Sequence, residues 1–277
     1  MTIKTIYVAR HGYRSNWLPE PHPPNPTGID SDPPLAPHGV EQAKELANYL
    51  TSLPEDERPQ FIISSPFYRC LQTSEPIAKA LHLKVTIDTG VGEWFKTTRE
   101  VIPKPAGYEQ LRQFFADTIG DETLWSGSGV IPSGSGETEE AIFFRAQKFW
   151  KAFIPAFEKA HPEVSRVLFV THAASKIALG LSLLGKLSVH DTIEFKGKET
   201  KLHSGACSID KYENQNGEWT ILENGKTDFL KDGEEMNWNF DVKFEAGSDE
   251  DIKARKAAAA ATAAAAKNTE FEVRSKV

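Results

Sequence analysis

Short apolar runs alternate with longer segments of helical periodicity over most of the chain. The runs predict buried strands at residues 6–9, 61–64, 84–87 and 167–171. The longer segments repeat apolar positions every three or four residues and predict helices at residues 38–53, 65–81, 106–115, 138–161 and 173–184. Strands that alternate with helices in this way predict an α/β fold, with a mainly parallel sheet and helices on both faces in three layers.

Proline and glycine mark the segments between these elements. Residues 18–37 contain eight prolines and therefore predict a long loop. Because this loop lies beside Arg14, it is a candidate wall or lid of a site, with a plain surface connection as the alternative. Pro66 is expected in the first turn of the second helix. Pro155 is expected to kink or interrupt the long helix, and the glycines and serines of residues 126–136 predict another loop.

A hairpin and then a tail follow the last predicted helix. Residues 206–212 and 219–223 are predicted strands, joined through Asn216-Gly217, a dipeptide typical of two-residue turns. The hairpin adds two strands to those predicted from the apolar runs. The chain is then expected to form one domain at residues 1–245 and a separate tail at 246–277.

The tail differs in composition from the rest of the chain. Ser248 and Asp251 have the spacing of a capping box. Asp251 and Arg255, like Asp249 and Lys253, can pair one helical turn apart. Residues 257–266 include nine alanines and have almost no apolar stripe, so a solvated, frayed or disordered helix is expected, with partner binding as the alternative.

The composition narrows the class of protein. The chain has 277 residues and a net charge of −7, which gives no reason to expect direct nucleic-acid binding. No apolar run is long enough for a membrane helix, and no signal peptide is expected. The two cysteines, Cys70 and Cys207, are too few for a disulfide framework and fit a reducing compartment. A cytoplasmic location, a nuclear location or both are therefore expected.

Polar residues with chemical reactivity follow the ends of the predicted strands. Because ligands bind at the carboxyl ends of strands in open α/β sheets, these side chains are expected to converge. A histidine beside guanidiniums suggests a nucleophile next to an anion site. Each residue alone has an ordinary explanation, such as a surface ion pair or a buried histidine, but their combination favours a site. The residues are Arg10, His11, Arg14, Arg69, Glu93 and His172.

Several motifs of the chain together resemble the histidine phosphatase superfamily, in the branch of the phosphoglycerate mutases. They are Arg10-His11-Gly12, Gly39-x-x-Gln42-Ala43, Ser64-Ser-Pro-x-x-Arg69-Cys-x-Gln-Thr73, Glu93, Gly136-Glu137-Thr138 and Thr171-His172-Ala173. The resemblance spans roughly residues 2–212. It implies a phosphoglycerate mutase-like fold and a phosphatase domain within residues 1–245.

The resemblance also implies a mechanism. His11 would attack phosphorus and become phosphohistidine, while Glu93 protonates the leaving oxygen and then activates water. Arg10, Arg69 and His172 would hold the phosphoryl oxygens. Further substrate contacts are implied for Arg14 and Ala173. Because guanidiniums can neutralise phosphoryl charge, no metal and no other cofactor are expected.

Arg14 favours a phosphatase over a mutase. Mutases of the superfamily usually carry serine at this position, whereas phosphatases related to the suppressors of T-cell receptor signalling resemble this chain in Arg14 and in Glu93-Trp94. Five aromatic residues are candidates for a rim around a flat or apolar leaving group: Tyr13, Trp17, Trp94, Phe95 and Trp125. Ordinary core packing is the alternative for at least half of them.

A closer resemblance is to fungal members of the superfamily, a group that includes a phosphatase-like subunit of transcription factor IIIC. It rests on residues 13–19, 28–32, 233–240 and 245–249. It implies a stand-alone phosphatase that acts on a phosphorylated small molecule or a phosphoprotein. The alternative is a binding or assembly subunit linked to transcription factor IIIC. The acidic, aromatic segment 228–241 either covers the sheet edge or docks a protein partner, and the tail is a second candidate for docking.

Overall fold

The computed structural model describes residues 2–242, 244, 247–248, 250–255 and 257. The chain divides into two compact units, Met1–Asp241 and Val242–Val277. The boundary predicted from the sequence lies at residues 245 and 246, and the separate folding of the two parts stays a prediction. Among the described residues, no helix combines the length and the apolar character that crossing a membrane requires.

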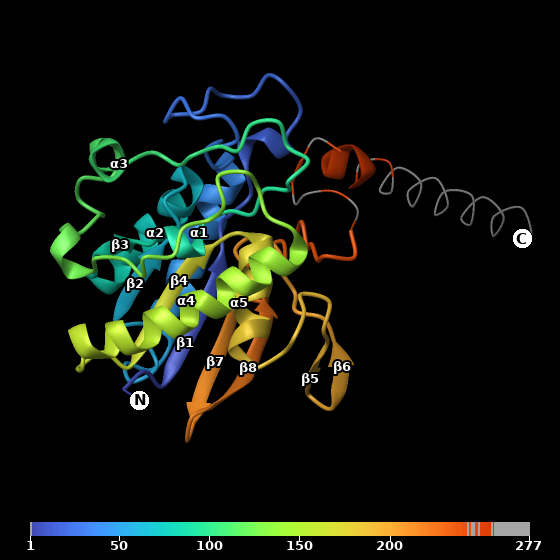
Figure 1. Cartoon of the computed structure of the whole chain (residues 1–277). Helices are drawn as coiled ribbons and strands as arrows, with labels where there is room; N and C mark the ends of the chain where they lie inside the picture. The colour runs from blue at the N-terminus through green and yellow to red at the C-terminus, as the bar shows by residue number, and fades with distance from the viewer. Residues whose placement is uncertain (1, 243, 245–246, 249, 256, 258–277) are drawn as a thin grey trace, which may run out of the picture. The chain divides into compact units, whose positions relative to one another are not determined.

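A six-stranded sheet forms the centre of the first unit (Figure 1). In spatial order its strands are β3 (Val85–Ile87), β2 (Phe61–Ser64), β4 (Arg166–Thr171), β1 (Thr5–Arg10), β7 (Ile209–Gln215) and β8 (Glu218–Lys226). The first four strands pair in parallel, whereas β7 and β8 are antiparallel to their neighbours. The carboxyl ends of β1, β2, β3 and β4 therefore lie along one edge of the sheet.

Two pairs of helices cover the faces of this sheet (Figure 1). Helix α1 (Pro37–Ser52) packs against α2 (Tyr68–Leu81) on one face, and α4 (Glu139–Ala160) packs against α5 (Ala173–Leu183) on the other. Successive residues of β4 pack against the helices on opposite faces of the sheet. Leu168 belongs to the core cluster shared with α1 and α2, whereas the ring of Phe169 lies against Phe149 and Phe153 of α4. The predicted three-layer α/β/α fold is confirmed.

Shorter elements complete the first unit. They are the 3-10 turns η1 (Ser15–Trp17), η2 (Thr89–Val91) and η3 (Glu122–Leu124), helix α3 (Tyr108–Phe114), and the small hairpin of β5 (Ile193–Phe195) and β6 (Lys198–Thr200). The sequence pattern did not predict β5 and β6. These strands are three residues long, and Ile193 is their one buried residue, so they are too short to set an apolar pattern.

Three local predictions differ from the structure. Helix α2 begins at Tyr68 because the residue before it has an extended backbone, so Pro66 precedes the first turn instead of lying in it. Helix α4 continues through Pro155, so the helix is not interrupted there, and a kink at this residue stays a prediction. Strand β7 begins at Ile209 and not at residue 206, because Cys207 has a φ of 51° and turns the chain just before the strand.

The acidic, aromatic segment 228–241 covers part of the first unit. Trp238 is only 2% exposed and Phe240 only 5%. Both rings lie against Trp94, at centroid distances of 6.2 Å and 5.3 Å. The docking alternative required exposed aromatics, and that premise is wrong for these two residues.

The described part of the second unit contains a short helical segment at residues 250–255. The predicted N-cap is present, since Ser248 Oγ accepts a hydrogen bond from the Asp251 N–H at 3.2 Å. Asp251 Oδ1 accepts from Arg255 Nε at 2.8 Å, as the spacing predicted. The expected partner of Lys253, Asp249, and the alanine run from residue 258 onward lie outside the described residues.

Candidate active site

His11 lies directly beyond β1, at the carboxyl edge of the sheet. Its ring is 1% exposed, and Nδ1 lies 2.8 Å from the Gly12 carbonyl. A carbonyl only accepts, so Nδ1 carries the proton and Nε2 keeps its lone pair in the neutral ring. Burial, followed by the charges of Arg69 and Arg10, holds the pKa of His11 well below its ordinary value. The ring is therefore neutral and nucleophilic at neutral pH.

Close backbone packing fixes the turn that presents His11. A Cβ on Gly12 would lie 2.6 Å from the carbonyl oxygen of Gly39, and a Cβ on Gly39 would lie 2.1 Å from that of Tyr13. The Gln42 amide oxygen accepts from the Tyr13 N–H at 2.9 Å. These contacts explain the physical role of the Gly39-x-x-Gln42 motif, which packs α1 onto the turn after His11.

Arg69 stands in the first turn of α2 and contacts the other site residues. Its Nη2 lies 2.9 Å from Glu93 Oε2 and 3.0 Å from His172 Nδ1. Its Nη1 lies 3.3 Å from the carboxylate of Asp32. The Arg69 side chain is 1% exposed, and Nε is buried without a hydrogen-bond partner in the described part of the chain.

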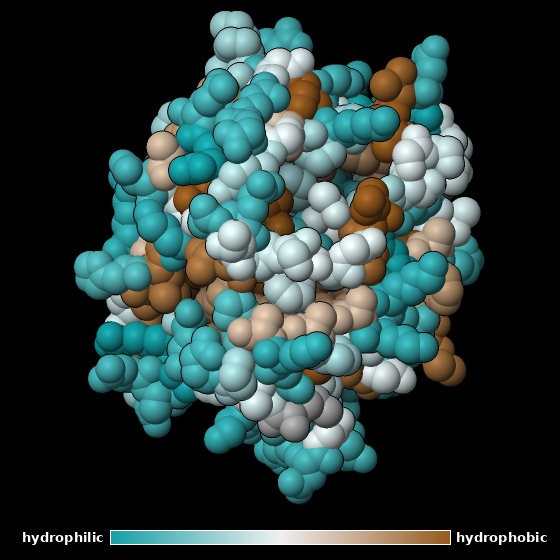
Figure 2. Space-filling model, turned by 60° about the vertical axis from the view of Figure 1, so that its left-hand side comes forward, coloured by the Kyte–Doolittle hydropathy of each residue, from teal (hydrophilic) through white to brown (hydrophobic). Residues whose placement is uncertain are grey.

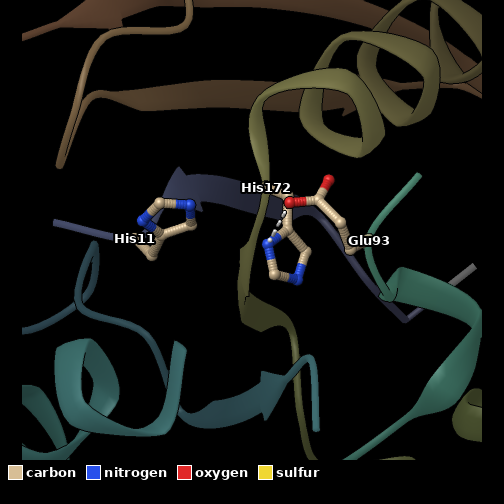
Figure 3. Close-up of side chains that lie close together, drawn as sticks. All are labelled: His11, Glu93 and His172. Carbon is tan, nitrogen blue, oxygen red and sulfur yellow. Dashed lines mark ion pairs between the residues drawn. The ribbon is translucent and has the colours of Figure 1, made fainter. Parts of the chain in front are cut away.

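His172 is the N-cap residue of α5 and is completely buried. Its Nε2 lies 2.7 Å from Ser65 Oγ, and its Nδ1 lies 3.1 Å from Glu93 (Figure 3). Burial lowers the pKa of His172 to about 4, although Glu93 opposes that shift. Burial alone would raise the pKa of Glu93, but contacts with His172 and Arg69 hold it below its ordinary value. Ala173, the first residue of α5, is also buried.

Trp17 packs over two further guanidiniums. Its ring centroid lies 5.2 Å from Arg10 Cζ and 5.5 Å from Arg14 Cζ, and its side chain is 2% exposed. Arg14 donates from Nε to the Asn16 amide oxygen at 3.1 Å. Burial lowers the pKa of Arg14 to about 9, so it still carries its charge at neutral pH. The rings of Trp17 and His11 are 5.9 Å apart, which places the indole beside the nucleophile candidate.

The predicted aromatic rim is only partly present. Phe95 lines a cavity beside Glu93, whereas Trp125 packs against Phe153 and Phe157 in the core. Trp94 packs beneath the acidic, aromatic segment 228–241, as described above. For Trp94 and Trp125 the alternative of ordinary core packing is correct, because each bonds its indole N–H inside the protein.

The cavity has a volume of about 450 Å³ and adjoins Glu93. Its wall is largely apolar, with Lys104 and Glu137 as its other charged residues. The apolar lining consists of Pro66, Phe67, Phe95, Ile102, Pro103, Pro105, Ile131 and Pro132, among others. Phe67 also lies against the site residues, 5.2 Å from the His172 ring centroid and 4.8 Å from Arg69 Cζ. Figure 2 shows one face of the molecule, on which the exposed hydrophobic residues lie in several separate patches.

The donor set could also hold a metal ion. Ligand atoms of His11, Glu93 and His172 all lie within 4.8 Å of one another. Two imidazoles and one carboxylate are ligands that zinc accepts. However, the positive charges of three arginines depress the pKa of His11, which is one of these three residues. The arginines are Arg69, Arg10 and Arg14. The local charge therefore opposes a cation and favours an anion.

Two buried residues near the site were not singled out from the sequence. Asp32 is 0% exposed and accepts from the Tyr68 N–H at 2.9 Å as well as from Arg69. The proline-rich loop 18–37 therefore forms a wall of the site, as one of its two alternatives predicted. Lys176 is buried against Asp210. Lys176 has no sequence signal beyond its charge within an otherwise uncharged helix, and Asp32 has none that distinguishes it from the nearby Asp30.

The chain matches the model of the histidine phosphatase superfamily (branch 1) over residues 6–226. It is 50% identical over 279 residues to the transcription factor tau 55 kDa subunit of Saccharomyces cerevisiae, a match that covers 92% of this chain. The aligned part is 62% of that subunit, so the chain spans less than two thirds of this relative.

Two solved structures show the same fold. One is the ecdysone phosphate phosphatase of the silkworm Bombyx mori in complex with tungstate, with a TM-score of 0.58 and 17% identity over 80% of this chain and 93% of that one. The other is phosphoserine phosphatase of Entamoeba histolytica, with a TM-score of 0.51 and 20% identity over 82% of this chain and 98% of that one. Identities this low support the fold and do not transfer a substrate.

Proposed function

Because the chain belongs to branch 1 of the histidine phosphatase superfamily, we propose that it hydrolyses phosphomonoesters through a phosphohistidine on His11. One observation carries this proposal. The Gly12 carbonyl fixes the proton on Nδ1, so the lone pair of Nε2 is available within a group of three arginines. A neutral nucleophile beside fixed positive charge suits attack on a phosphoryl group.

The reaction has two steps in this proposal. His11 Nε2 forms a bond to phosphorus while the bond from phosphorus to the ester oxygen breaks, and the leaving oxygen takes a proton. A water oxygen then attacks phosphorus, the bond to Nε2 breaks, and phosphate leaves. Dividing the displacement in this way replaces one difficult step with two easier ones.

Glu93 is the proposed proton carrier. In the described structure it is ionised and paired with Arg69 at 2.9 Å. A bound phosphoryl group would compete for Arg69, weaken this pair and raise the pKa of Glu93, because its stabilising charge is then shared. Glu93 can thereby receive a proton from the substrate monoanion, pass it to the leaving oxygen, and later accept one from water.

The guanidiniums and His172 are proposed to bind the phosphoryl oxygens. The buried Nε of Arg69 supports this role, because a buried donor without a partner is costly unless a ligand uses it. Arg10 and Arg14 add positive charge, and the N-terminal end of α5 at Ala173 adds its helix dipole. Charge neutralisation by these groups can replace the metal ion that other phosphoryl-transfer enzymes use.

The cavity beside Glu93 supports an apolar leaving group. It adjoins the carboxyl that is proposed to protonate the leaving oxygen, and its volume of about 450 Å³ lies in the range of small-molecule sites. We therefore propose phosphomonoesters whose alcohol is aromatic or otherwise apolar, carried by a small molecule or by a protein side chain.

Hydrolysis of para-nitrophenyl phosphate by wild type and His11→Ala tests the proposal. Turnover is expected for the wild type and should fall to background in His11→Ala, with an unchanged circular dichroism spectrum. Tyr13→Phe is a suitable control, since it removes only a hydroxyl from a side chain near His11 and keeps the ring that is a candidate for the aromatic rim. Equal turnover by wild type and His11→Ala would refute the nucleophile.

A second candidate function is assembly into a complex of the transcription factor IIIC type. The observation that favours it is the 50% identity to the tau 55 kDa subunit over 92% of this chain. This candidate implies a nuclear location. Affinity purification of the tagged chain, with His11→Ala as a second bait, tests it. Recovery of transcription factor IIIC subunits with both baits supports assembly independent of catalysis, whereas their absence contradicts it.

A further inference from the structure

The orientation of Arg10 depends on a segment that has no regular secondary structure. Arg10 Nη1 donates to the Ser204 carbonyl at 2.5 Å and to the Met236 carbonyl at 2.6 Å. Both N–H bonds of Nη1 lie in the plane of the guanidinium, so two acceptors on this nitrogen define that plane. Residues 201–205 belong to no helix or strand. The positions of this segment and of the Met236 carbonyl together therefore determine where the Arg10 charge points.

A buried lysine ties this segment to the helix that His172 caps. Lys176 Nζ donates at 2.7 Å to the carbonyl of His203, the residue before Ser204. Lys176 lies in the first turn of α5, and its own N–H donates to the His172 carbonyl at 2.8 Å. One helical turn thus connects His172 with the backbone that holds Arg10.

Asp210 fixes the lysine in turn. Its carboxylate lies 2.6 Å from Lys176 Nζ, and both side chains are 0% exposed. Asp210 also accepts from the Tyr212 hydroxyl at 2.9 Å and from the Gly225 N–H at 2.6 Å. Burial lowers the pKa of Lys176, and Asp210 opposes that shift. A carboxylate with three partners and no exposure has little freedom to move.

Strand β8 leaves no space for the segment to relax on its own. Gly225 has a φ of +56°, and a Cβ there would lie 2.3 Å from the Cβ of His203. The neighbouring Asn224 accepts from the His203 N–H at 2.9 Å through its amide oxygen. His203 is thus held at its N–H by Asn224 and at its carbonyl by Lys176.

We propose that Lys176, through its buried pair with Asp210, is a positioning residue that aims Arg10 at a bound phosphoryl group. This inference rests on the proposed phosphoryl site. The buried pair would not touch substrate and would act through the His203 carbonyl on the adjacent Ser204 carbonyl, one of the two that hold Arg10. If the pair were purely structural, its removal would lower stability and leave anion affinity of the folded protein unchanged.

The test uses the full chain and orthovanadate as the probe, with affinity measured by calorimetry and folding by thermal unfolding. The variant Lys176→Met/Asp210→Asn removes both charges together, because removing one partner leaves an uncompensated buried charge. Lys211→Met is the control, since Lys211 also pairs with a carboxylate, Glu57, but follows Asp210 in β7 and lies on the opposite face of the sheet, against Tyr7. The double variant is expected to bind vanadate about tenfold more weakly, and the control is expected to match wild type.

A double-mutant cycle separates positioning from a general loss of order. In an Arg10→Met background, Lys176→Met/Asp210→Asn should weaken vanadate binding no further, because its effect passes through Arg10. An equally large further loss in that background would overturn the proposal, as would wild-type affinity in the double variant.

The double variant could fail to fold, or the wild type could fail to bind vanadate or to hydrolyse substrate, and each of these results has a defined meaning. Should the double variant fail to fold, Asp210→Asn alone keeps the side-chain shape and lets Lys176 lose its proton, and unchanged vanadate affinity in it would overturn the proposal. A wild-type chain that binds no vanadate would overturn it as well. A wild type that binds vanadate but hydrolyses no phosphomonoester contradicts the proposed function alone.

Discussion

Arg145 of α4 is expected to contribute strongly to stability, because it joins α4 to the loop that carries Glu93. Its Nε and Nη2 bind both carboxylate oxygens of Glu137, at 2.8 Å and 2.9 Å, and its Nη1 bonds the carbonyls of Gly90 and Gly92 at 2.9 Å and 3.1 Å. Arg145 and Glu137 are each 5% exposed. Breaking such a pair from one side costs about 3–5 kcal/mol.

Arg145→Leu would also leave the buried Gly90 carbonyl without this donor, at about 1 kcal/mol or more, whereas the Gly92 carbonyl keeps a hydrogen bond from Ser175 Oγ at 2.6 Å. We therefore expect a loss of about 5 kcal/mol, a large share of the stability of a typical domain. Because Gly92 precedes Glu93, the folded fraction should also hydrolyse substrate more slowly.

Urea unfolding, followed by tryptophan fluorescence and circular dichroism, measures this loss. Arg145→Leu/Glu137→Leu should recover at least half of it, since no unpaired charge remains buried. Lys148→Leu, on the exposed side of the same helix, should change stability by about 0.5 kcal/mol or less. An Arg145→Leu protein within about 1 kcal/mol of wild type would refute the assigned role of the pair.

Three further predictions concern the chemistry. Glu93→Gln should lower kcat/KM, which reports phosphoryl transfer to His11 and not the later hydrolysis of the intermediate, by about 10²–10⁴-fold on an alkyl phosphate and much less on para-nitrophenyl phosphate, whose leaving group needs little protonation; equal losses of kcat/KM on both substrates would contradict the role of Glu93 as the acid. The depressed pKa of His11 keeps its ring neutral, so activity should persist above that pKa and fall as the pH drops through it. Arg69→Met removes one depressing charge and should move the acidic limb of the kcat/KM profile to higher pH; an unmoved limb would show that Arg69 does not set this pKa. Activity should survive EDTA, and a loss that added Mg²⁺ restores would reveal a metal requirement.

The apolar periodicity was sufficient to predict the layers of the fold. Runs such as 167–171 form buried strands because both faces of the sheet are covered by helices, and no polar position interrupts them. The ends of helices and strands were less predictable because they depend on the backbone angles of single residues. Cys207, with its positive φ, delays β7, and a sequence pattern carries no sign of that angle.

The site was predictable where chemistry follows a strand end and unpredictable where distant segments meet. His11, Arg69 and His172 converge because β1, β2 and β4 are parallel neighbours. Asp32 in the proline-rich loop and the Met236 carbonyl have no local signature, and their contacts with arginines span 37 and 226 residues of sequence. The density of packing that brings them together is visible only in three dimensions.

Rapid-quench trapping of the phosphorylated enzyme tests the central claim most directly. The protein would be mixed with ³²P-labelled phosphomonoester, quenched under alkaline conditions that preserve phosphohistidine, and mapped by peptide mass spectrometry. We expect label on His11 in the wild type, more of it in Glu93→Gln where hydrolysis of the intermediate is slowed, and none in His11→Ala. Turnover without label on His11, or label that persists in His11→Ala, would contradict the account.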